Sequence, residues 1–218
     1  MSIFQNKKHY IFDFDGTLVD SMPYFSQNLL EFLQQQKVDF PADIIKIVTP
    51  LGYPGMARCF QKDLGMDMTQ EQIIKLTQAA VYPAYRDVIP LKEGVYDYLR
   101  QLKERGCKLH VLTASPHLVV DPCLQRLEII DWFDNIWSCE DFGTTKADPE
   151  IYKMAAREIG APVSEVAFFD DNLGALQTAK RAGMVTVGVY DASSEEVAED
   201  IRHTADRYIV SFGELMED

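Results

Sequence analysis

Cysteine is scarce in this sequence, and its placement excludes two classes of small protein. Four cysteines occur among 218 residues, and none forms a C-x-x-C pair. A zinc site built on cysteine or a disulfide framework needs closer and more regular spacing. We therefore expect reduced thiols that pack in the core, namely Cys59, Cys107, Cys123 and Cys139.

Basic runs and long apolar runs are also missing. The formal net charge is −13, with 21 lysines and arginines against 34 aspartates and glutamates, which repels nucleic acid and anionic membranes. No segment approaches the roughly 18 uncharged apolar residues of a membrane span. The first residues, MSIFQNKKHY, lack the apolar region of a secretory signal. We expect a soluble cytoplasmic protein, a monomer or a homodimer, that binds neither nucleic acid nor membrane.

What is present is an alternation of strand-like and helix-like segments. Short apolar runs rich in β-branched and aromatic residues predict strands at 9–14, 108–113, 133–138, 165–170 and 184–189. Apolar residues at helical spacing, with a proline near one start and glycines at the ends, predict helices at 95–106, 148–160 and 173–183. Strands alternating with helices indicate an α/β fold with a doubly wound, Rossmann-like parallel sheet.

The interval from Ser21 to Asp87 breaks this alternation. It contains amphipathic stretches at 24–36 and 69–82, the second opened by a possible capping box from Thr69 to Gln72, and no convincing strand. We interpret residues 20–87 as an inserted all-helical domain and residues 1–19 with 88–218 as the sheet domain. The segment 82–94 is expected to be the linker that returns the chain to the sheet.

Polar side chains follow several of the predicted strands. Asp13 and Asp15 end the first, Thr113 the second and Asp170 with Asp171 the fourth, while Lys146 follows the third. Ligands bind at the carboxyl ends of the strands in an open parallel sheet. Converging carboxylates repel one another unless a cation bridges them, and oxygen ligands suit Mg²⁺. A lysine and a hydroxyl nearby are what a phosphate group needs.

Simpler interpretations of these residues stay open at this point. Asp-Gly after a strand is a common turn signal, and Asp or Asn often caps a helix. Thr113 is compatible with an ordinary strand end, and Lys146 with a solvated loop.

Four blocks, taken in order, resemble the haloacid dehalogenase-like hydrolases. They are DFDGT at 13–17, VLTAS at 111–115, Lys146 in TKADPEIY, and FFDDN at 168–172. The similarity is to the phosphatase branch that carries a helical cap domain after the first block, which includes phosphoglycolate phosphatases and β-phosphoglucomutases. It implies a Mg²⁺-dependent phosphoric monoester hydrolase acting on a small phosphorylated metabolite.

The resemblance also implies roles for the first block. Asp13 would attack phosphorus and form an aspartyl-phosphate, and Asp15 would act as general acid and then as general base. Thr17 is expected to belong to the substrate-binding residues and to orient Asp15 by a hydrogen bond. The Asp13 carboxylate, the Asp15 backbone carbonyl and the Asp170 carboxylate would hold Mg²⁺.

The later blocks would bind the phosphoryl group and support the metal. Thr113 and the amide of Ala114 would bind phosphoryl oxygens, and Lys146 would neutralise charge shared by phosphate and Asp13. Asp171 and Asn172 would contact the metal through water or hold its ligands.

Two residues depart from the family's usual pattern. Ala114 stands where an asparagine is common, and Ala147 where a proline is common. The first change removes a side-chain donor, and the second removes a restraint on the loop.

Substrate choice in this family comes from the cap. The segment 49–65 places two glycines and a proline before a short helix that carries Arg58, so we expect a loop that approaches the substrate and an arginine that contacts it. A phosphomutase of the same family is the nearest alternative. A phospho-acceptor signalling domain is the alternative from a different class, because such domains also gather Asp, Thr and Lys at strand ends.

Overall fold

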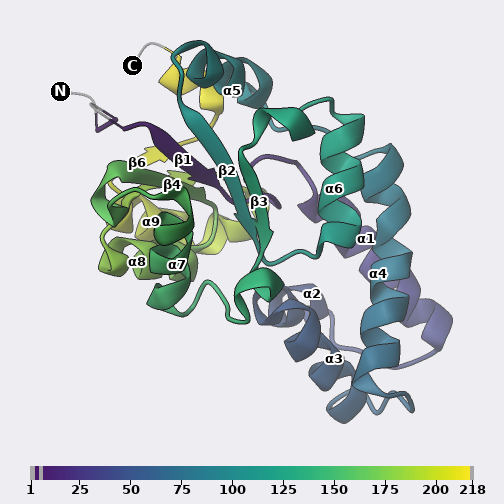
Figure 1. Ribbon diagram of the computed structural model, residues 1–218. Helices are drawn as coiled ribbons and strands as arrows, with labels where there is room; N and C mark the ends of the chain where they lie inside the picture. The colour runs from purple at the N-terminus through teal and green to yellow at the C-terminus, as the bar shows by residue number, and fades with distance from the viewer. Residues whose placement is uncertain (1–2, 5–6, 217–218) are drawn as a thin grey trace. The chain divides into compact units, whose positions relative to one another are not determined.

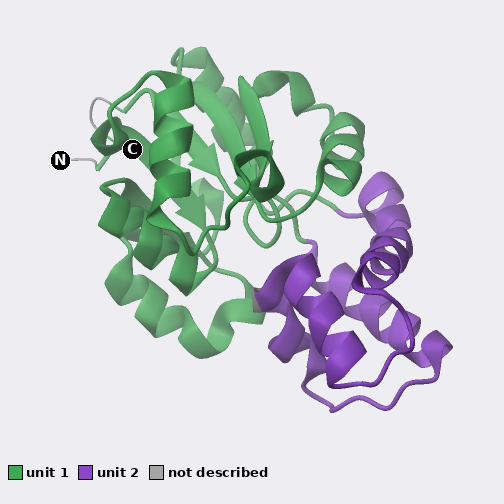
Figure 2. Ribbon diagram, turned by 60° about the horizontal axis from the view of Figure 1, so that its bottom comes forward, with its two compact units in different colours: residues 1–20, 90–218 green, residues 21–89 purple. Residues whose placement is uncertain are grey.

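The computed structural model describes residues 3–4 and 7–216 (Figure 1). Contacts within the chain divide it into two compact units, coloured separately in Figure 2. The core unit comprises residues 1–20 and 90–218, and the helical unit comprises residues 21–89. The sequence interpretation drew these divisions at 19/20 and 87/88.

The core unit is built on one six-stranded parallel sheet with the strand order β3-β2-β1-β4-β5-β6. This confirms the predicted fold class. The strands are β1 (His9–Phe12), β2 (Lys108–Thr113), β3 (Asn135–Ser138), β4 (Val166–Asp170), β5 (Val185–Val189) and β6 (Arg207–Ile209). The edge strand β6 escaped prediction because it has three residues, of which two are only half-buried.

Among the residues that the structure describes, the helices of the core unit lie between the strands in sequence. They are α5 (Val95–Glu104), α6 (His117–Arg126), α7 (Pro149–Ile159), α8 (Leu173–Ala182) and α9 (Ala198–Thr204). Short 3-10 segments lie in the connections and after β6: η2 (Ile130–Trp132), η3 (Cys139–Phe142), η4 (Val163–Glu165), η5 (Ala192–Val197) and η6 (Phe212–Leu215).

Both faces of the central strands are covered, so the side-chain alternation of β1 and β4 fills two cores. On one face, Ile11 and Phe168 pack with Tyr152 of α7 and Leu176 of α8, where α7, α8 and α9 lie together (Figure 1). All five residues of β4 are buried, and the first four, VAFF, form a continuous apolar run rather than an alternating one.

The opposite face is aromatic. Phe12 and Phe169 lie on it with ring centroids 4.7 Å apart, and Phe212 of η6 stacks on Phe169 at 6.0 Å. Tyr98 of α5 packs against Phe212 at 5.6 Å. Neighbouring residues in sequence, such as Phe168 and Phe169, therefore anchor different layers.

The helical unit contains α1 (Met22–Gln36), α2 (Ile44–Val48), η1 (Thr49–Leu51), α3 (Gly52–Lys62) and α4 (Gln70–Asp87). The predicted capping box is present: the Gln72 amide donates to Thr69 Oγ1 and the Thr69 amide to Gln72 Oε1. No helix among residues 3–4 and 7–216 is both long and apolar enough to cross a membrane.

Two expectations for this segment are wrong. Residues 82–87 were predicted as linker, but α4 continues through Pro83 to Asp87, because Ala84 and Tyr85 are buried on its inner face. Gly52 and Gly55 were predicted in a loop, but both lie within α3. That helix forms because Tyr53, Met56, Ala57 and Phe60 supply a buried face at helical spacing.

Candidate active site

The candidate site lies where the strand order of the sheet reverses. The chain moves outward from β1 through β2 to β3, and then from β4 through β5 to β6 on the other side of β1. The carboxyl ends of β1 and β4 therefore flank the crevice in which open α/β sheets bind ligands. Phe12 pairs with Phe169 in register, so the next residues, Asp13 and Asp170, are neighbours.

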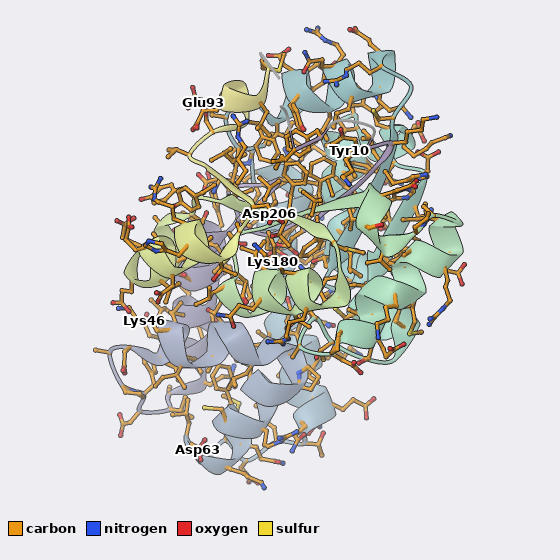
Figure 3. All side chains as sticks on the ribbon, turned by 90° about the vertical axis from the view of Figure 1, so that its left-hand side faces the viewer. Tyr10, Lys46, Asp63, Glu93, Lys180 and Asp206 are labelled. Atoms are coloured by element: carbon orange, nitrogen blue, oxygen red, sulfur yellow. The ribbon has the colours of Figure 1, made fainter. Side chains whose placement is uncertain are left out.

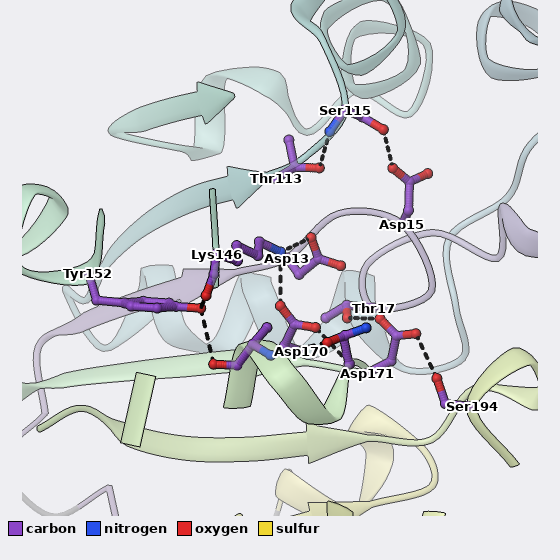
Figure 4. Close-up of polar contacts among 12 residues, drawn as sticks. Asp13, Asp15, Thr17, Thr113, Ser115, Lys146, Tyr152, Asp170, Asp171 and Ser194 are labelled. Atoms are coloured by element: carbon purple, nitrogen blue, oxygen red, sulfur yellow. Dashed lines mark hydrogen bonds and ion pairs between the residues drawn. The ribbon is translucent and has the colours of Figure 1, made fainter. Parts of the chain in front are cut away.

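Three buried carboxylates gather at this crevice (Figure 4). Asp13, Asp170 and Asp171 each offer an oxygen atom, and these oxygens lie within 4.8 Å of one another. The Asp13 amide donates to the Phe169 carbonyl oxygen at 2.8 Å, which fixes the backbone just beyond β1. The adjacent β4 strand holds Asp170 at its last residue.

Lys146 brings one positive charge into this group. Its Nζ donates to Asp13 Oδ1 and, at 2.8 Å, to Asp170 Oδ2. Burial by itself lowers the pKa of Lys146, but the two carboxylates raise it well above its usual range. The side chain therefore stays an ammonium ion and bridges the ends of β1 and β4.

The carboxyl groups have strongly shifted pKa values. Burial raises the pKa of Asp13 to about 7, and Lys146 opposes this rise while Asp170 adds to it. Burial, together with the charges of Asp170 and Asp13, raises the pKa of Asp171 well above its usual range. The site thus concentrates more negative charge than its lysine balances.

A hard divalent cation fits this donor set. The ammonium of Lys146 compensates one of the three carboxylate charges, and a divalent ion would compensate the other two. The donors are all oxygen, which is the chemistry that Mg²⁺ prefers. Asp171 joins the cluster directly, although the sequence interpretation gave it a water-mediated or supporting contact.

The loop after β1 is shaped by Gly16. This residue has φ +73°, and a Cβ atom there would lie 2.7 Å from Asp171 Oδ2. Thr17 follows with a fully buried side chain, and its hydroxyl donates to Asp171 Oδ1 at 3.3 Å. The sequence interpretation paired Thr17 with Asp15, whereas the structure gives its hydroxyl to Asp171. The close approach of the two loops is why glycine is needed.

Asp15 is held by a residue that the sequence reasoning missed. Ser115 Oγ donates to Asp15 Oδ2 at 2.6 Å, and the Ser115 amide donates to Thr113 Oγ1 at 3.0 Å. Ser115 therefore links the loop after β2 to the Asp15 carboxylate. Ala114 between them is exposed, and α6 begins two residues after Ser115. Ser115 is the second hydroxyl residue of the VLTAS block, and the sequence interpretation gave it no role.

Asn172 both caps α8 and supports Asp170. Its side-chain oxygen accepts from the Ala175 amide at 3.1 Å, and its own amide donates to Asp170 Oδ1 at 2.7 Å. The helix-cap interpretation is therefore correct for Asn172, and the same residue also orients an acid of the cluster.

Tyr152 anchors the Lys146 loop from α7. Its hydroxyl lies 3.0 Å from the carbonyl oxygens of Lys146 and of Ala175. Burial raises the pKa of Tyr152 far above its ordinary value, so the hydroxyl keeps its proton and donates. This contact restrains the loop in which Ala147 replaces the family's proline.

Seven of the predicted site residues thus meet around the ends of β1, β2 and β4: Asp13, Asp15, Thr17, Thr113, Lys146, Asp170 and Asp171. Arg58 belongs to the helical unit, where it is exposed on α3. Besides Ser115 and Tyr152, the sequence reasoning missed Ser194, whose hydroxyl donates to Asp171 Oδ2 at 3.2 Å. No short motif marks Ser194, because it reaches the site only through tertiary structure.

Comparison with known proteins finds similarity to enzymes with phosphatase and phosphomutase names. A phosphoglycolate phosphatase of Rhodobacter capsulatus is 25% identical over 199 residues, which cover 89% of this chain and 90% of that protein. The crystal structure of CbbY from Rhodobacter sphaeroides in complex with phosphate matches with a TM-score of 0.83 at 22% identity, covering 96% of each chain. β-Phosphoglucomutase from Clostridium difficile matches with a TM-score of 0.77 at 16% identity, covering 96% of this chain and 93% of that chain.

The family model of the haloacid dehalogenase-like hydrolases matches residues 7–183. That span includes all four sequence blocks and every residue of the carboxylate cluster. The chain therefore belongs to the haloacid dehalogenase-like hydrolase family.

Proposed function

We propose that this protein is a Mg²⁺-dependent phosphatase that hydrolyses a small phosphomonoester through an aspartyl-phosphate on Asp13. The observation that carries the proposal is the meeting of Asp13, Lys146 and Asp170 at the switch point of the sheet. The phosphoglycolate phosphatase relative supports the phosphatase activity in this proposal.

In the first step, an Asp13 carboxylate oxygen attacks phosphorus and the bond from phosphorus to the ester oxygen breaks. Asp15, placed by Ser115, donates its proton to the departing oxygen. Lys146, already beside Asp13, balances charge on the transferring phosphoryl group. Asp13, Asp170, Asp171 and the backbone carbonyl of Asp15 are the groups that would hold Mg²⁺, which supplies electrostatic stabilisation of the phosphoryl oxygens.

In the second step, Asp15 accepts a proton from water as that water attacks the phosphorus of the aspartyl-phosphate. The bond from phosphorus to the Asp13 oxygen then breaks and inorganic phosphate leaves. Thr113, the last residue of β2, and the amide of Ala114, in the loop before α6, are proposed to bind the phosphoryl oxygens, since a helix N-terminus favours anions.

The helical unit is proposed to be the cap that selects the substrate. Arg58 is exposed on α3 and is proposed to contact an anionic group of the substrate. The test is Arg58→Ala across a panel of substrates that the wild type hydrolyses. Unchanged KM for every substrate would defeat this role.

The decisive experiment measures inorganic phosphate release from a panel of phosphomonoesters with Mg²⁺ or with chelator. The variants are Asp13→Asn, which keeps the shape of the side chain, and Asp97→Asn on the exposed surface of α5 as matched control. We expect Mg²⁺-dependent release that only Asp13→Asn abolishes, and one phosphoryl group on acid-quenched wild type by intact-protein mass spectrometry.

Other outcomes point to the alternatives. Isomerisation of a sugar phosphate without net phosphate release indicates a phosphomutase. Stable phosphorylation of Asp13 without turnover indicates a phospho-acceptor domain. Release that Asp13→Asn leaves intact refutes the aspartyl-phosphate mechanism.

A further inference from the structure

Asp171 is held from two sides by elements that are far apart in the sequence. Thr17 Oγ1 in the loop after β1 donates to its Oδ1, and Ser194 Oγ in η5 donates to its Oδ2. Each oxygen therefore has a hydroxyl donor, which sets the plane of the carboxylate (Figure 4). In the proposed mechanism Asp171 is one of the groups that would hold Mg²⁺. That role does not explain what keeps the hydroxyls of Thr17 and Ser194 in place.

Lys92 connects the two loops that carry these hydroxyls. Its Nζ donates to the Gly16 carbonyl oxygen at 2.8 Å, to the Tyr190 carbonyl oxygen at 2.5 Å and to Asp191 Oδ2 at 2.8 Å. Its side chain is 14% exposed and that of Asp191 is 5% exposed. All three donors of the ammonium group have an acceptor, as burial of a charge requires.

Asp191 passes this restraint on to η5. While its Oδ2 accepts from Lys92, its Oδ1 accepts from the amide of Ser193 at 2.9 Å and from the hydroxyl of Ser193 at 2.6 Å. These bonds fix the start of η5 at Ser193, and Ser194 is the residue that follows. Lys92 thus bonds directly to Gly16, the residue before Thr17. It reaches η5, which carries Ser194, through Asp191.

We propose that Lys92, Asp191 and Ser194 are positioning residues that hold Asp171 in the orientation needed to bind the divalent cation. This inference rests on the metal site of the proposed function and extends it to residues outside the four sequence blocks. None of the three belongs to the carboxylate cluster itself.

The physical reason lies in the repulsion within the cluster. Asp171 gathers with Asp13 and Asp170 in a buried place where like charges interact strongly. Without an external restraint, the Asp171 side chain lowers its energy by turning away from its neighbours. Hydrogen bonds from Thr17 and Ser194 oppose this motion, so the cation meets an arrangement of oxygens that is already formed.

A buried ion pair such as Lys92–Asp191 adds little net stability, because its desolvation cost offsets its attraction. Its value in this network is geometric: one compact ammonium group sets the separation of the loop after β1 and the loop after β5. Removing a side chain of this network is therefore expected to weaken Mg²⁺ binding, and removing the Ser194 hydroxyl is expected to do so without destabilising the fold.

The test is Mg²⁺ binding measured by isothermal titration calorimetry on the whole protein, without substrate. The variants are Ser194→Ala and Lys92→Met, with Ser194→Thr as the conservative rescue. The matched control is Lys180→Met, which also removes a lysine that bonds an aspartate, Asp206, and a backbone carbonyl, that of Thr204 (Figure 3). That pair lies beside the start of β5, at the opposite end of the strand from Asp191.

We expect the Kd for Mg²⁺ to rise about tenfold in Ser194→Ala and between about ten- and a hundredfold in Lys92→Met. Ser194→Thr and Lys180→Met should keep the wild-type Kd. The thermal midpoint of Ser194→Ala in chelator should equal that of the wild type, which separates positioning from folding. Ser194→Ala carries the test on its own if Lys92→Met does not fold.

Two negative results have different meanings. If the wild type binds Mg²⁺ and both variants bind it equally well, the positioning network is refuted while the proposed phosphatase stands. If the wild type binds no divalent cation, the metal site of the proposed function fails and this inference falls with it.

Discussion

Replacing Lys146 by methionine tests how much of the proposed catalysis depends on one buried ammonium group. The substitution keeps most of the apolar stem and removes both hydrogen bonds, to Asp13 and to Asp170. A hydrogen bond to a charged group contributes about 1.5–3 kcal/mol, so the two together bound the loss at about 3–6 kcal/mol. In the proposed mechanism the Lys146 charge acts on the transferring phosphoryl group, and each 1.36 kcal/mol lost from the transition state is a factor of ten in rate, so the lower end corresponds to a fall in kcat of about 10².

The assay is steady-state phosphate release at saturating substrate and Mg²⁺. Lys153→Met on α7 is the matched control, because Lys153 forms an exposed ion pair with Glu150 and such pairs contribute little. We expect wild-type kcat in the control and a loss on the order of 10² in Lys146→Met. A Lys146→Met enzyme that binds Mg²⁺ and keeps its kcat within about threefold would refute the reasoning.

Three further predictions follow from the structure. Ser115→Ala should lower kcat about tenfold without changing the circular dichroism spectrum, because the Ser115 hydroxyl donates to Asp15. Ser115→Thr should restore kcat. Equal kcat values in the wild type and Ser115→Ala would show that this hydrogen bond does not contribute to catalysis. Gly16→Ala should lower both the thermal midpoint and Mg²⁺ affinity, since its Cβ would meet Asp171, whereas Gly106→Ala, with φ +76° and open space, should lower only the midpoint. Burial lowers the pKa of His110 from 6.5 to about 4, so the folded state binds fewer protons than the unfolded state. His110 should therefore contribute a fall of about 3 kcal/mol in the free energy of unfolding as the pH drops from 6.5 to about 4. Denaturant titrations of the wild type and His110→Asn at both pH values isolate this contribution, because the raised pKa of Asp13 acts in the opposite direction in both proteins.

His110 illustrates why such a group is sensitive to acid. It lies 2% exposed in β2, between the rings of His9 and Trp137. The amide of Asn135 lies 3.0 Å from its Nδ1, and this contact requires an unprotonated nitrogen if the amide donates. A proton added there would lose that bond and bury a charge among aromatic rings.

The fold was predictable because its signals are local. Strands β2, β4 and β5 are mostly buried segments of five or six residues, rich in apolar and β-branched side chains. Helices α7 and α8 carry their own caps at Asp148, Asn172, Gly160 and Gly183. These features depend on neighbours within one helical turn or on hydrophobic content alone. Helix α4 was predicted too short, because Pro83 is a local stop signal that the burial of Tyr85 overrides.

By itself, the sequence determined the parallel α/β sheet, the helical insertion and the acids that end β1 and β4, since each is encoded in a short contiguous segment. Only the tertiary structure decided which of these acids share a cluster, that Thr17 bonds Asp171, and that Ser115 bonds Asp15. It alone joined Lys92 to Asp191 and Ser194 to Asp171, across 99 and 23 residues of chain. The physical reason is that a hydroxyl or an ammonium group acquires its role from the acceptor that folding places within hydrogen-bonding distance, and that acceptor leaves no trace in the residues beside it.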